Sequence, residues 1–425
     1  MSGLRFCFLT TFYPPHNFGG DGIAVQRLAR GLVRAGHQVT VVHDTDAFAA
    51  LSAVPAGASP AEPDGLTVIP LRSGVGALSP LLTQQLGRPV VNGRRIARLL
   101  RDGDFDVINF HNISLIGGPG LLKYGRALKL YMAHEHWLVC PTHVLWRYGR
   151  EACPARDCVR CQLTHGRPPQ LWRHTGLLEG ELHHVDAFIA MSEFSRQKHR
   201  EFGFAPEMEV LPSFLPPTSE CASDAANAGS SERPQTRPYH LFVGRLERLK
   251  GVQDLLPHFA GDGDVDLLIA GDGTYASVLR SMAAGMPRVR FLGRTAADDL
   301  VRYYRHAVAL LVPSLCFETF GMVLLEAFRE STPVIARRLG PFVEMVESTG
   351  AGALFSDAPE LAAAMQGLQR DPARRAAAGA AALDAFAARW QESVVIPGYL
   401  EIVRRAAERR ADLKVLAALP PRRVA

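Results

Sequence analysis

The feature that most constrains the fold is a repeated unit in which a short apolar run leads into a glycine-containing loop and then an amphipathic helix. In the first copy, the apolar run covers residues 4–10, the loop 13–22, the helix about 23–34 and the next apolar run 39–43. Apolar runs that alternate with helical patterns predict parallel strands joined by crossover helices. We therefore expect an α/β fold that opens with a strand–loop–helix–strand unit.

The same unit begins again after a change in composition. Beyond Leu215 the chain becomes rich in Pro, Ser, Ala and Gly, and a new apolar run starts at residue 240. Such a change marks a linker between domains, and 425 residues are enough for two or three domains. The expected boundaries are an N-terminal domain at 1–212, a linker at 213–238, a second domain at 239–385 and C-terminal helices at 386–425.

Charge and hydropathy exclude several classes of protein. The formal net charge of +5 is compatible with an anionic ligand but too weak to indicate nucleic-acid binding. No apolar run reaches the roughly 18 residues of a membrane-spanning helix, and the first residues form a strand pattern rather than a signal peptide. We expect a cytoplasmic protein. A helical region at 78–101 carries five arginines, which form either a solvated face or a contact with the inner face of an acidic membrane.

Histidines follow two predicted strands of the first domain. His111 and Asn112 come after a strand at 106–111, and His134 and His136 come after a strand at 128–133. In open parallel sheets, ligands bind beyond the carboxyl ends of the strands. These side chains are therefore candidates for a sugar or acceptor site, although a single histidine at such a place is often structural.

Two cations occupy the first strand-to-helix loop of the second domain. Arg245 and Lys250 follow the strand at 240–243. Such a loop is a common place for a diphosphate, which Arg grips with a planar fork and Lys meets as a point charge. Glycines stand at or after neighbouring strand ends and permit close backbone approach; they are Gly244, Gly273 and Gly293.

One stretch of the second domain, residues 315–330, carries two glutamates at a suggestive spacing. If a helix begins at about Thr319, Glu318 and Glu326 lie about a dozen Å apart, at ~1.5 Å rise per residue. That separation suits two hydroxyl contacts on one elongated ligand, not a proton-sharing pair. The free amides near Phe320, Gly321 and Met322 would favour an anion between them. The alternative is a plain amphipathic helix with two solvated glutamates.

Four of the seven cysteines fall within 22 residues of a segment at 137–169 that shows no helical period. Cys140, Cys153, Cys158 and Cys161 have the spacing C-x12-C-x4-C-x2-C. Four thiolates fit a structural zinc site, and an iron–sulfur cluster is the second choice. Either His143 or His165 could replace one ligand. The alternative is four reduced thiols in an ordered loop.

The ordered set of motifs resembles a known family. Gly244-Arg245 with Lys250-Gly251, then Gly271-Asp-Gly273, Phe291-Leu-Gly293 and Glu318-x7-Glu326, together with the loop Gly19-Gly20-Asp-Gly22, resemble the retaining glycosyltransferases of family 4. Asp21-Gly22 departs from the Ala-Glu of many relatives. The sequence from His134 to Pro141 resembles a subgroup with a cysteine-rich insertion. The resemblance implies the GT-B fold: two facing, doubly wound, Rossmann-like domains with a cleft between them.

The resemblance also implies roles for particular residues. Arg245 and Lys250 would meet the donor diphosphate, and Glu318 would hold hydroxyls of the donor sugar. Glu326 would bind the ribose, and His134 would lie near the sugar. The wider donor site implied includes Gly19, Gly20, Gly244, Gly273, Gly293, Thr319, Phe320, Gly321 and Met322. The C-terminal helices would return to the first domain.

These features predict transfer of a sugar from a nucleoside diphosphate sugar, with UDP the first choice, to an acceptor hydroxyl. Surface polysaccharide or glycolipid is the expected acceptor, including a lipid-linked one. No catalytic metal is expected, because cations and helix amides would stabilise the leaving diphosphate. The alternatives are a nucleotide-sugar epimerase on the same fold, transfer to a small-molecule acceptor, and a non-enzymatic scaffold built around the cysteine segment.

Overall fold

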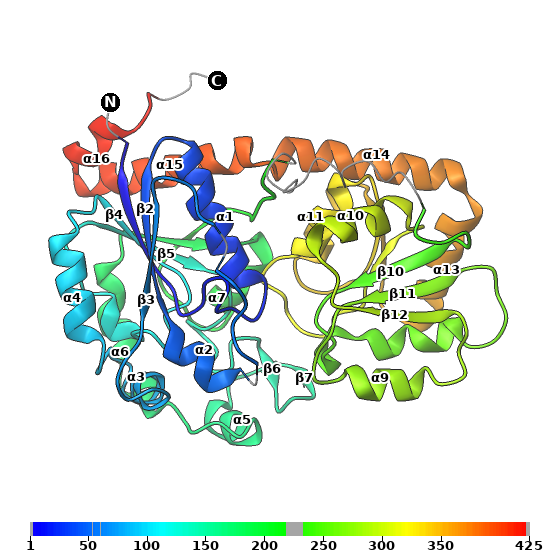
Figure 1. Cartoon of the computed structure of the whole chain (residues 1–425), viewed down its shortest axis with the longest axis horizontal. Coiled ribbons are helices and arrows are strands. Elements are labelled where there is room, and N and C mark those ends of the chain that lie inside the picture. Colours follow the sequence, from blue (N-terminus) through cyan, green and yellow to red (C-terminus); the bar gives the residue numbers. More distant parts are fainter. Residues whose placement is uncertain (1–2, 53, 60, 218–232, 422–425) are drawn as a thin grey trace. The chain divides into compact units, whose positions relative to one another are not determined.

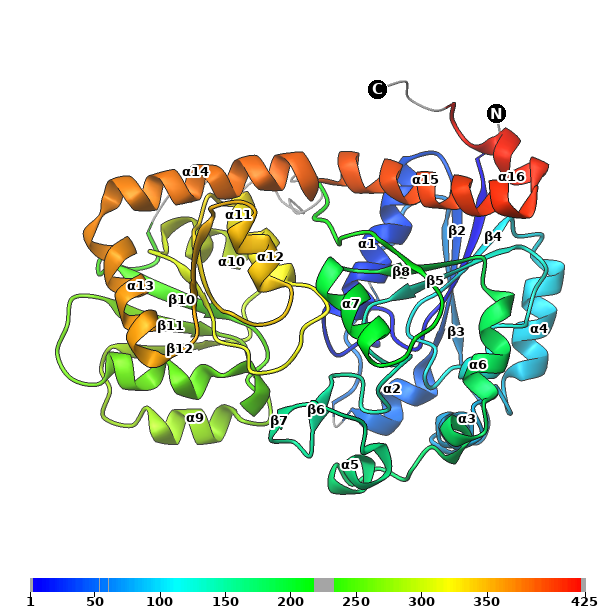
Figure 2. The same cartoon turned by 180° about the vertical axis from the view of Figure 1, so that it is seen from behind.

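The computed structural model describes residues 3–52, 54–59, 61–217 and 233–421. Within them the chain forms two compact units (Figures 1 and 2). The first combines residues up to Tyr148, Pro154–Ser213 and the chain from Val395 onward, and the second combines Gly149–Cys153 with Phe214–Val394. Most of the linker predicted at 213–238 lies outside the described residues.

The first unit is built on a seven-stranded sheet in the order β3-β2-β1-β4-β5-β8-β9, and every pairing in it is parallel. β1 lies near the middle, and the chain winds outward from it in both directions, which defines a doubly wound sheet. The strands are β1 Arg5–Leu9, β2 Gln38–Asp44, β3 Leu66–Leu71, β4 Val107–Phe110, β5 Leu128–Ala133, β8 Ala187–Ala190 and β9 Met208–Val210.

Helices connect these strands. In α1, a buried stripe that includes Leu28 and Leu32 faces the sheet, while Ser192 caps α7 by accepting a hydrogen bond from the Ser195 amide. The helices are α1 Gly20–Arg34, α2 Thr45–Leu51, α3 Leu78–Leu86, α4 Gly93–Asp102, α5 Cys158–Thr164, α6 Leu177–Glu181 and α7 Glu193–Glu201, with short 3-10 turns η1 Pro119–Leu121, η2 Leu171–His174 and η3 Leu182–His184. Short strands β6 Trp146–Arg147 and β7 Glu151–Ala152 lie in the cysteine-rich segment.

The second unit has a six-stranded parallel sheet in the order β12-β11-β10-β13-β14-β15. Its strands are β10 Tyr239–Val243, β11 Asp266–Ala270, β12 Val289–Gly293, β13 Leu310–Val312, β14 Val334–Arg337 and β15 Gly352–Phe355. Its helices are η4 Arg248–Lys250, η5 Val252–Asp254, η6 Leu256–Phe259, α9 Ala276–Met282, α10 Ala297–His306, α11 Met322–Arg329, α12 Phe342–Glu347, α13 Ala358–Arg370 and α14 Pro372–Arg389. The expected α/β class with two Rossmann-like parallel sheets is confirmed.

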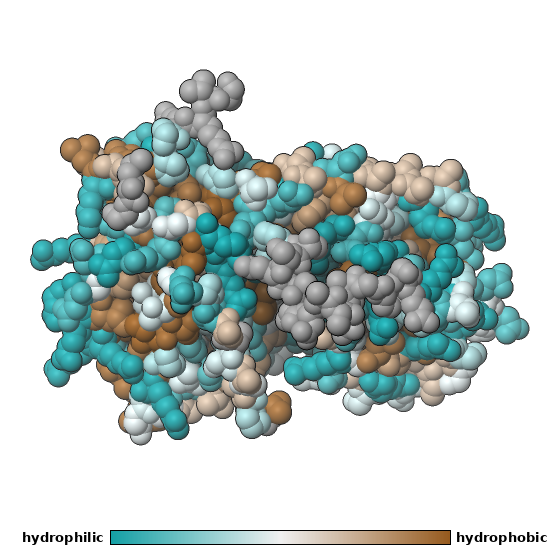
Figure 3. All heavy atoms as spheres, turned by 45° about the horizontal axis from the view of Figure 1, so that its top comes forward, coloured by the Kyte–Doolittle hydropathy of each residue, from teal (hydrophilic) through white to brown (hydrophobic). Residues whose placement is uncertain are grey.

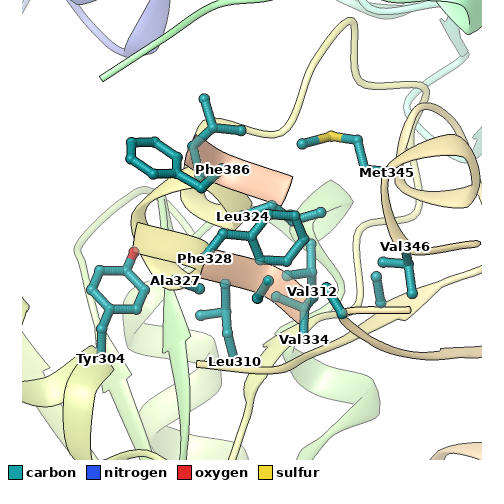
Figure 4. Packing of buried hydrophobic residues seen from close by; sticks show 14 of the residues in the cluster. Tyr304, Leu310, Val312, Leu324, Ala327, Phe328, Val334, Met345, Val346 and Phe386 are labelled. Carbon is teal, nitrogen blue, oxygen red and sulfur yellow. The ribbon is translucent and has the colours of Figure 1, made fainter. Parts of the chain in front are cut away.

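Helix α11 packs its apolar face onto the second sheet. Figure 4 shows Leu324 and Phe328 from this helix close to Val312 and Val334 from the strands beneath, and all four side chains are buried. Burying a leucine or phenylalanine contributes about 1.5–3 kcal/mol each. This packing fixes the orientation of α11 and therefore the directions in which its first amides and its polar residues point.

The C-terminal helix α15 Glu392–Arg410, followed by α16 Leu413–Ala418, belongs to the first unit from Val395 onward. Tyr399 is fully buried there and receives a hydrogen bond from the Asn109 side chain of β4 at 3.1 Å. Arg405 pairs with Glu209 of β9. Figures 1 and 2 both show α15 lying along this unit. The first unit is thus completed by the end of the chain.

Two sequence expectations need correction. The helix predicted over 78–101 is two helices, because Gly87, with a φ of 63°, ends α3 and α4 begins only at Gly93. The cysteine segment, which shows no helical period in the sequence, is partly helical, in α5.

Helix length and the distribution of charge on the surface both bear on contact with a membrane. None of the helices in the described part of the chain is long and apolar enough to cross a bilayer. On the face shown in Figure 3, hydrophilic side chains surround smaller apolar areas. In α4, Arg94, Arg95, Arg98 and Arg101 are exposed while Ile96 and Leu100 are buried, so the helix presents a basic face to its surroundings.

Candidate functional site

The loops beyond the carboxyl ends of β10, β11 and β13 are joined by backbone hydrogen bonds. The Leu246 amide donates to the Asp272 carbonyl at 2.9 Å, and the Leu315 amide donates to the Leu249 carbonyl at 2.8 Å. The second bond holds the loop with Lys250 against the loop that leads to Glu318. Residues far apart in the sequence are thereby brought to one edge of the sheet, where ligands bind in such folds.

Two glycines make this close approach possible. Gly251 has a φ of 75°, and a Cβ on it would lie 2.0 Å from the Pro313 carbonyl oxygen. Gly271 has a φ of 137°, and its Cβ would lie 1.9 Å from the Gly244 carbonyl oxygen. A side chain at either position would push the neighbouring backbone away. Glycine is therefore required here by the packing of the loops.

The structure pairs two of the predicted site residues directly. Nζ of Lys250 lies 2.5 Å from Oε1 of Glu318, and the Ser314 hydroxyl donates to the same oxygen at 3.2 Å. The two charged side chains are about one-fifth exposed. An ion pair in this setting is only partly screened by water, so removing either partner would leave the other charge poorly solvated.

Burial and charge act in opposite directions at this pair. Burial by itself would lower the pKa of Lys250, because it favours the neutral amine. The Glu318 carboxylate and the neighbouring Cys316 have the opposite effect and together outweigh burial. The pKa of Lys250 therefore lies above its usual value. Burial, followed by the Glu318 carboxylate, raises the pKa of the Cys316 thiol to about 12. At neutral pH the edge therefore carries a lysine cation and a neutral thiol.

The other charged candidates have partners near them. Nη1 of Arg245 lies 2.8 Å from Oε1 of Glu247 in the same loop. The Arg245 cation also offsets a small part of the rise in the pKa of the nearby Lys250. The Tyr304 hydroxyl donates to Oε2 of Glu326 at 2.8 Å. Arg245 is about half exposed, so its guanidinium can also reach a phosphate. Sequence reasoning missed Tyr304, because nothing near it in the chain indicates a site, and it missed Ser314, although this residue stands just before the stretch 315–330.

Helix α11 begins at Met322, three residues later than predicted, with Gly321 at its N-cap. A Cβ on Gly321 would lie 3.0 Å from the Phe342 ring, so packing as well as ligand approach favours glycine. The Leu324 amide donates to the Gly321 carbonyl at 2.9 Å, while the earlier amides of the first turn have no acceptor within the helix. Thr319 and Phe320 therefore lie in the loop ahead of the helix, and the anion-favouring end is at Met322.

In the first unit, the structure brings His111 and His134 together at the ends of β4 and β5. Nδ1 of His111 lies 2.8 Å from Nε2 of His134, and the rings stack with centroids 5.1 Å apart. The side-chain amide of Asn112 donates to the carboxylate of Asp21, at the start of α1, over 3.4 Å. Gly19 and Gly20 form the N-cap and first residue of that helix. Asp21 was noted in the sequence only as a departure from a family pattern.

Both rings of this pair are uncharged at neutral pH. Burial lowers the pKa of His134 to about 4, partly offset by the Asp21 carboxylate. Burial and the neighbouring His134 lower the pKa of His111 well below its usual value. This end of the first sheet therefore offers neutral hydrogen-bonding groups beside one carboxylate.

His136, predicted with the sugar or acceptor side, has a different environment. Its ring stacks on His199 of α7 with centroids 5.3 Å apart, and its amide donates to the His143 carbonyl. It is 1% exposed. These contacts give His136 a packing role in the base of the cysteine-rich segment, while its part in ligand binding stays a prediction.

The predicted zinc site has no support from the structure. Among the described residues there is no group of three or more His, Cys, Asp or Glu side chains arranged to hold a metal ion. The Cys161 sulfur accepts from the Tyr148 amide at 3.4 Å, and Cys140 lies 3.3 Å from the Thr142 hydroxyl. Cys158 forms no disulfide. The same observation leaves the iron–sulfur alternative without support.

A cavity of about 840 Å³ in the first unit lies away from these side chains. Its lining includes Leu182, Phe188, Phe204 and Met208, with charged residues such as Arg409 at its border. No residue predicted for the site lines it. Its size is within the range of ligand pockets, but size alone assigns no ligand.

Comparison with known proteins identifies the class. Residues 18–218 match the family described as Glycosyltransferase Family 4, and residues 224–384 match Glycosyl transferases group 1. Together the two matches span most of the chain. The chain therefore belongs to the glycosyltransferases of family 4 and group 1, and it is an enzyme of that class. Membership of a cysteine-rich subgroup stays a prediction.

Individual relatives agree over nearly the full length. Glycogen synthase from Mycobacterium tuberculosis is 27% identical over 398 residues, which cover 87% of each chain. Phosphatidyl-myo-inositol mannosyltransferase from Mycobacterium leprae is 26% identical over 419 residues, covering 94% of this chain and 98% of the relative.

Solved structures support the same fold. Sucrose-phosphate synthase from Thermosynechococcus elongatus has a TM-score of 0.71 at 20% identity, covering 95% of this chain and 98% of that one. HepE from Anabaena, solved in complex with UDP, has a TM-score of 0.63 at 18% identity, covering 95% and 100%. Together with the family matches, these neighbours identify the fold as GT-B.

Proposed function

We propose that the protein is a retaining glycosyltransferase that moves a hexosyl group from a UDP-sugar to an acceptor hydroxyl in surface polysaccharide or glycolipid synthesis. The observation that carries the proposal is the Lys250–Glu318 pair, held at 2.5 Å by loops at the carboxyl edge of the second sheet. A cation and a carboxylate fixed side by side suit a ligand with a diphosphate next to a hydroxylated sugar. The solved complex of HepE with UDP supports UDP as the first choice.

In this proposal the Lys250 ammonium bonds a phosphate oxygen while keeping Glu318, since it has three N–H donors. Arg245, half exposed in the same loop, adds a second cation. The first amides of α11 at Met322 face the same anion. These groups stabilise the charge that develops on the leaving diphosphate as the glycosidic bond breaks, without a divalent metal.

The sugar and ribose hydroxyls are assigned to carboxylates. Glu318 accepts hydrogen bonds from hydroxyls of the donor sugar. Glu326 accepts from the ribose, and the Tyr304 hydroxyl, which donates to Glu326, keeps this carboxylate in place. His134 contacts the donor sugar from the first unit. Attack from the side on which the diphosphate leaves gives retention, with a donor phosphate oxygen as base, as the family resemblance suggests.

We extend the proposal to the surroundings of the enzyme. The exposed arginines of α4 form a basic face suited to anionic lipid headgroups, which fits a lipid-linked acceptor. Sedimentation with anionic and neutral vesicles tests this part by itself. Binding to neither, or equally to both, at physiological salt would remove it and leave the transferase proposal intact.

The donor site is tested by thermal unfolding with a panel of nucleoside diphosphates. A ligand at about 100 times its dissociation constant adds ~2.7 kcal/mol to folding stability, which is readily seen as a shift in Tm. We expect UDP to give the largest shift and Glu326→Ala to reduce it. Glu347→Ala is the matched control, since Glu347 is half exposed and pairs with Arg338 on the surface. No shift with any diphosphate contradicts the proposal.

The reaction is tested by NMR of the products. With UDP-sugar and a polysaccharide or glycolipid acceptor fraction, the new linkage should keep the anomeric configuration of the donor. A changed free nucleotide-sugar formed without any acceptor would instead identify an epimerase. Transfer only to small hydroxylated compounds would identify the small-molecule alternative.

A further inference from the structure

We propose that His111 is a positioning residue, which donates a hydrogen bond from Nδ1 to Nε2 of His134 and so holds His134 as the neutral tautomer with its proton on Nδ1. The inference rests on the proposed function, in which His134 contacts the donor sugar. It adds which hydrogen-bonding group His134 presents and which neighbour determines it.

The two rings are held in a fixed geometry. Their bonded nitrogens are 2.8 Å apart and the ring planes differ by 27°. His111 is 1% exposed, and its ring packs against Phe8 of β1 with centroids 4.8 Å apart. The His111 amide donates to the Leu9 carbonyl at 2.9 Å, which continues the β1–β4 ladder. His111 is therefore the more firmly anchored of the two rings.

A bond between two neutral imidazoles contains one shared proton, so one ring must donate and the other accept. The second nitrogen of His111, Nε2, is buried and has no hydrogen-bond partner among the described residues. If His134 were the donor, His111 would carry its own proton on that Nε2, and a buried N–H would be unsatisfied. An unpaired buried N–H is the costlier and rarer arrangement. The favoured state has His111 donating from Nδ1.

A proton on Nε2 of His134 would break this arrangement, because two N–H groups would then face each other, whereas a second proton on His111 would go to its Nε2, away from the bond. Burial lowers the pKa of His134 to about 4 and that of His111 well below its usual value. Both rings therefore stay neutral at the pH at which the enzyme would work. A neutral His134 ring that accepts at Nε2 carries its proton on Nδ1.

The consequence concerns chemistry at the sugar. With its Nε2 lone pair engaged by His111, His134 has one further polar group, the Nδ1–H, which can only donate. Asp21, whose carboxylate raises the pKa of His134, and the Asn112 amide that donates to Asp21 complete the polar surroundings. His134 is thus suited to hold an oxygen of the donor and is unsuited to remove a proton from the acceptor.

The first test is ¹⁵N NMR of histidine-labelled, ligand-free protein, with the His134 signals assigned by their loss in His134→Gln. Protonated and bare ring nitrogens have well separated shifts. We expect Nδ1 of His134 to be protonated and Nε2 to be bare, and His111→Leu to change this pattern to a mixture. A protonated Nε2 in the native protein would overturn the proposal.

The second test compares two substitutions of equal size. The side-chain amide of His111→Asn can donate from nearly the position of Nδ1, whereas His111→Leu cannot donate. We expect the leucine variant to lose about ten-fold or more in kcat with little change in the donor KM, because orientation rather than binding is lost. The asparagine variant should recover most of that rate. Equal losses in both variants would overturn the proposal.

The two tests separate this inference from the proposed function. The NMR pattern is measured without substrate, so it stands or falls whether or not sugar transfer is found. If the expected tautomer is present and no transfer or diphosphate binding occurs, the proposed function fails alone. If transfer occurs and the tautomer is the opposite one, only the role of His111 fails.

Discussion

The two sheets present opposite kinds of chemistry at corresponding edges. At the first, two stacked histidines, the buried His111 and the half-buried His134, are uncharged, with their bonded nitrogens 2.8 Å apart. At the second, Lys250 and Glu318 are both charged and partly exposed, 2.5 Å apart. The same architecture thus supports neutral donors in one unit and an ion pair in the other. The difference teaches that the fold supplies the position, while local burial and partners decide the charge state.

The largest expected effect follows from the uneven distribution of buried histidines. In the first unit, burial lowers the pKa of His43, His134 and His199 to about 4, whereas in the second it does so only for His240 among the described residues. The unfolded chain binds these protons at about pH 6.5. Stability is therefore full above pH 6.5 and falls as the pH decreases toward 4, by up to about 3 kcal/mol for each ring.

The first unit should accordingly unfold first on acidification. Hydrogen exchange followed by mass spectrometry at steps between pH 7 and 4, corrected for intrinsic exchange, measures each unit in the intact chain. Peptides from β4, β5 and α7 should lose protection before those from β13 and α11. Loss of protection in the reverse order would show that the histidines do not control acid stability.

Replacement of Lys250 tests the charged pair at the edge of the second sheet. Lys250→Met keeps the length of the side chain but removes the cation that faces Glu318. We expect the transfer rate to fall by about 100–1,000-fold, as for loss of one preorganised donor at a developing negative charge. The measurement is the initial rate with donor and acceptor.

Lys414→Met is the matched control, because this lysine is two-thirds exposed and pairs with Asp106 in the first unit. Its effect on rate should be small. A fully active Lys250→Met enzyme would mean that the ion pair is structural only.

Substitution of Gly251 tests whether backbone packing holds the charged pair in place. Gly251→Ala would place its Cβ 2.0 Å from the Pro313 carbonyl, while Gly261→Ala has a similar φ of 79° and nothing within 4 Å. Strain from the positive φ alone costs roughly 1–2 kcal/mol. Gly251→Ala should therefore be clearly more destabilising in denaturant unfolding and should lower activity. Equal losses would leave only the φ strain as the cause.

The smallest expected effects come from two helix caps whose side chains have no part in the proposed donor site. Ser192 caps α7 in the first unit and Asp357 caps α13 in the second, each by accepting from a backbone amide. Alanine at either position should cost about 1 kcal/mol in denaturant unfolding and leave the donor KM unchanged. A large change in KM for one of them would extend the site beyond the residues assigned here.

The strands were largely predictable because each is a short apolar run with a clear end, as in β5, whose bounds agree with the expected strand at 128–133. The first residues of the helices were less predictable. The sequence predicts that α11 begins at about Thr319, but with Gly321 as its N-cap the helix begins at Met322. Local residue patterns do not reveal which of several neighbouring residues becomes the N-cap of a helix.

The partners within the site were beyond the reach of the sequence. Lys250 and Glu318 were each chosen for contact with a ligand, but 68 residues separate them, and their bond depends on the loops being packed together. His111 and His134 were chosen as separate strand-end residues, and their mutual bond follows from the β4–β5 pairing. Candidates could be identified one at a time, whereas pairing is a property of the folded chain.

The buried Tyr399 has a consequence for how the protein is made. The second unit is nearly one continuous stretch, Phe214–Val394, so it can fold as soon as it leaves the ribosome. The first unit starts earlier but must wait for α15, which brings Tyr399 to Asn109 and Arg405 to Glu209. Its emerging sheet therefore lacks part of its core until α15 has been synthesised. A chain that stalls before α15 would expose that apolar surface.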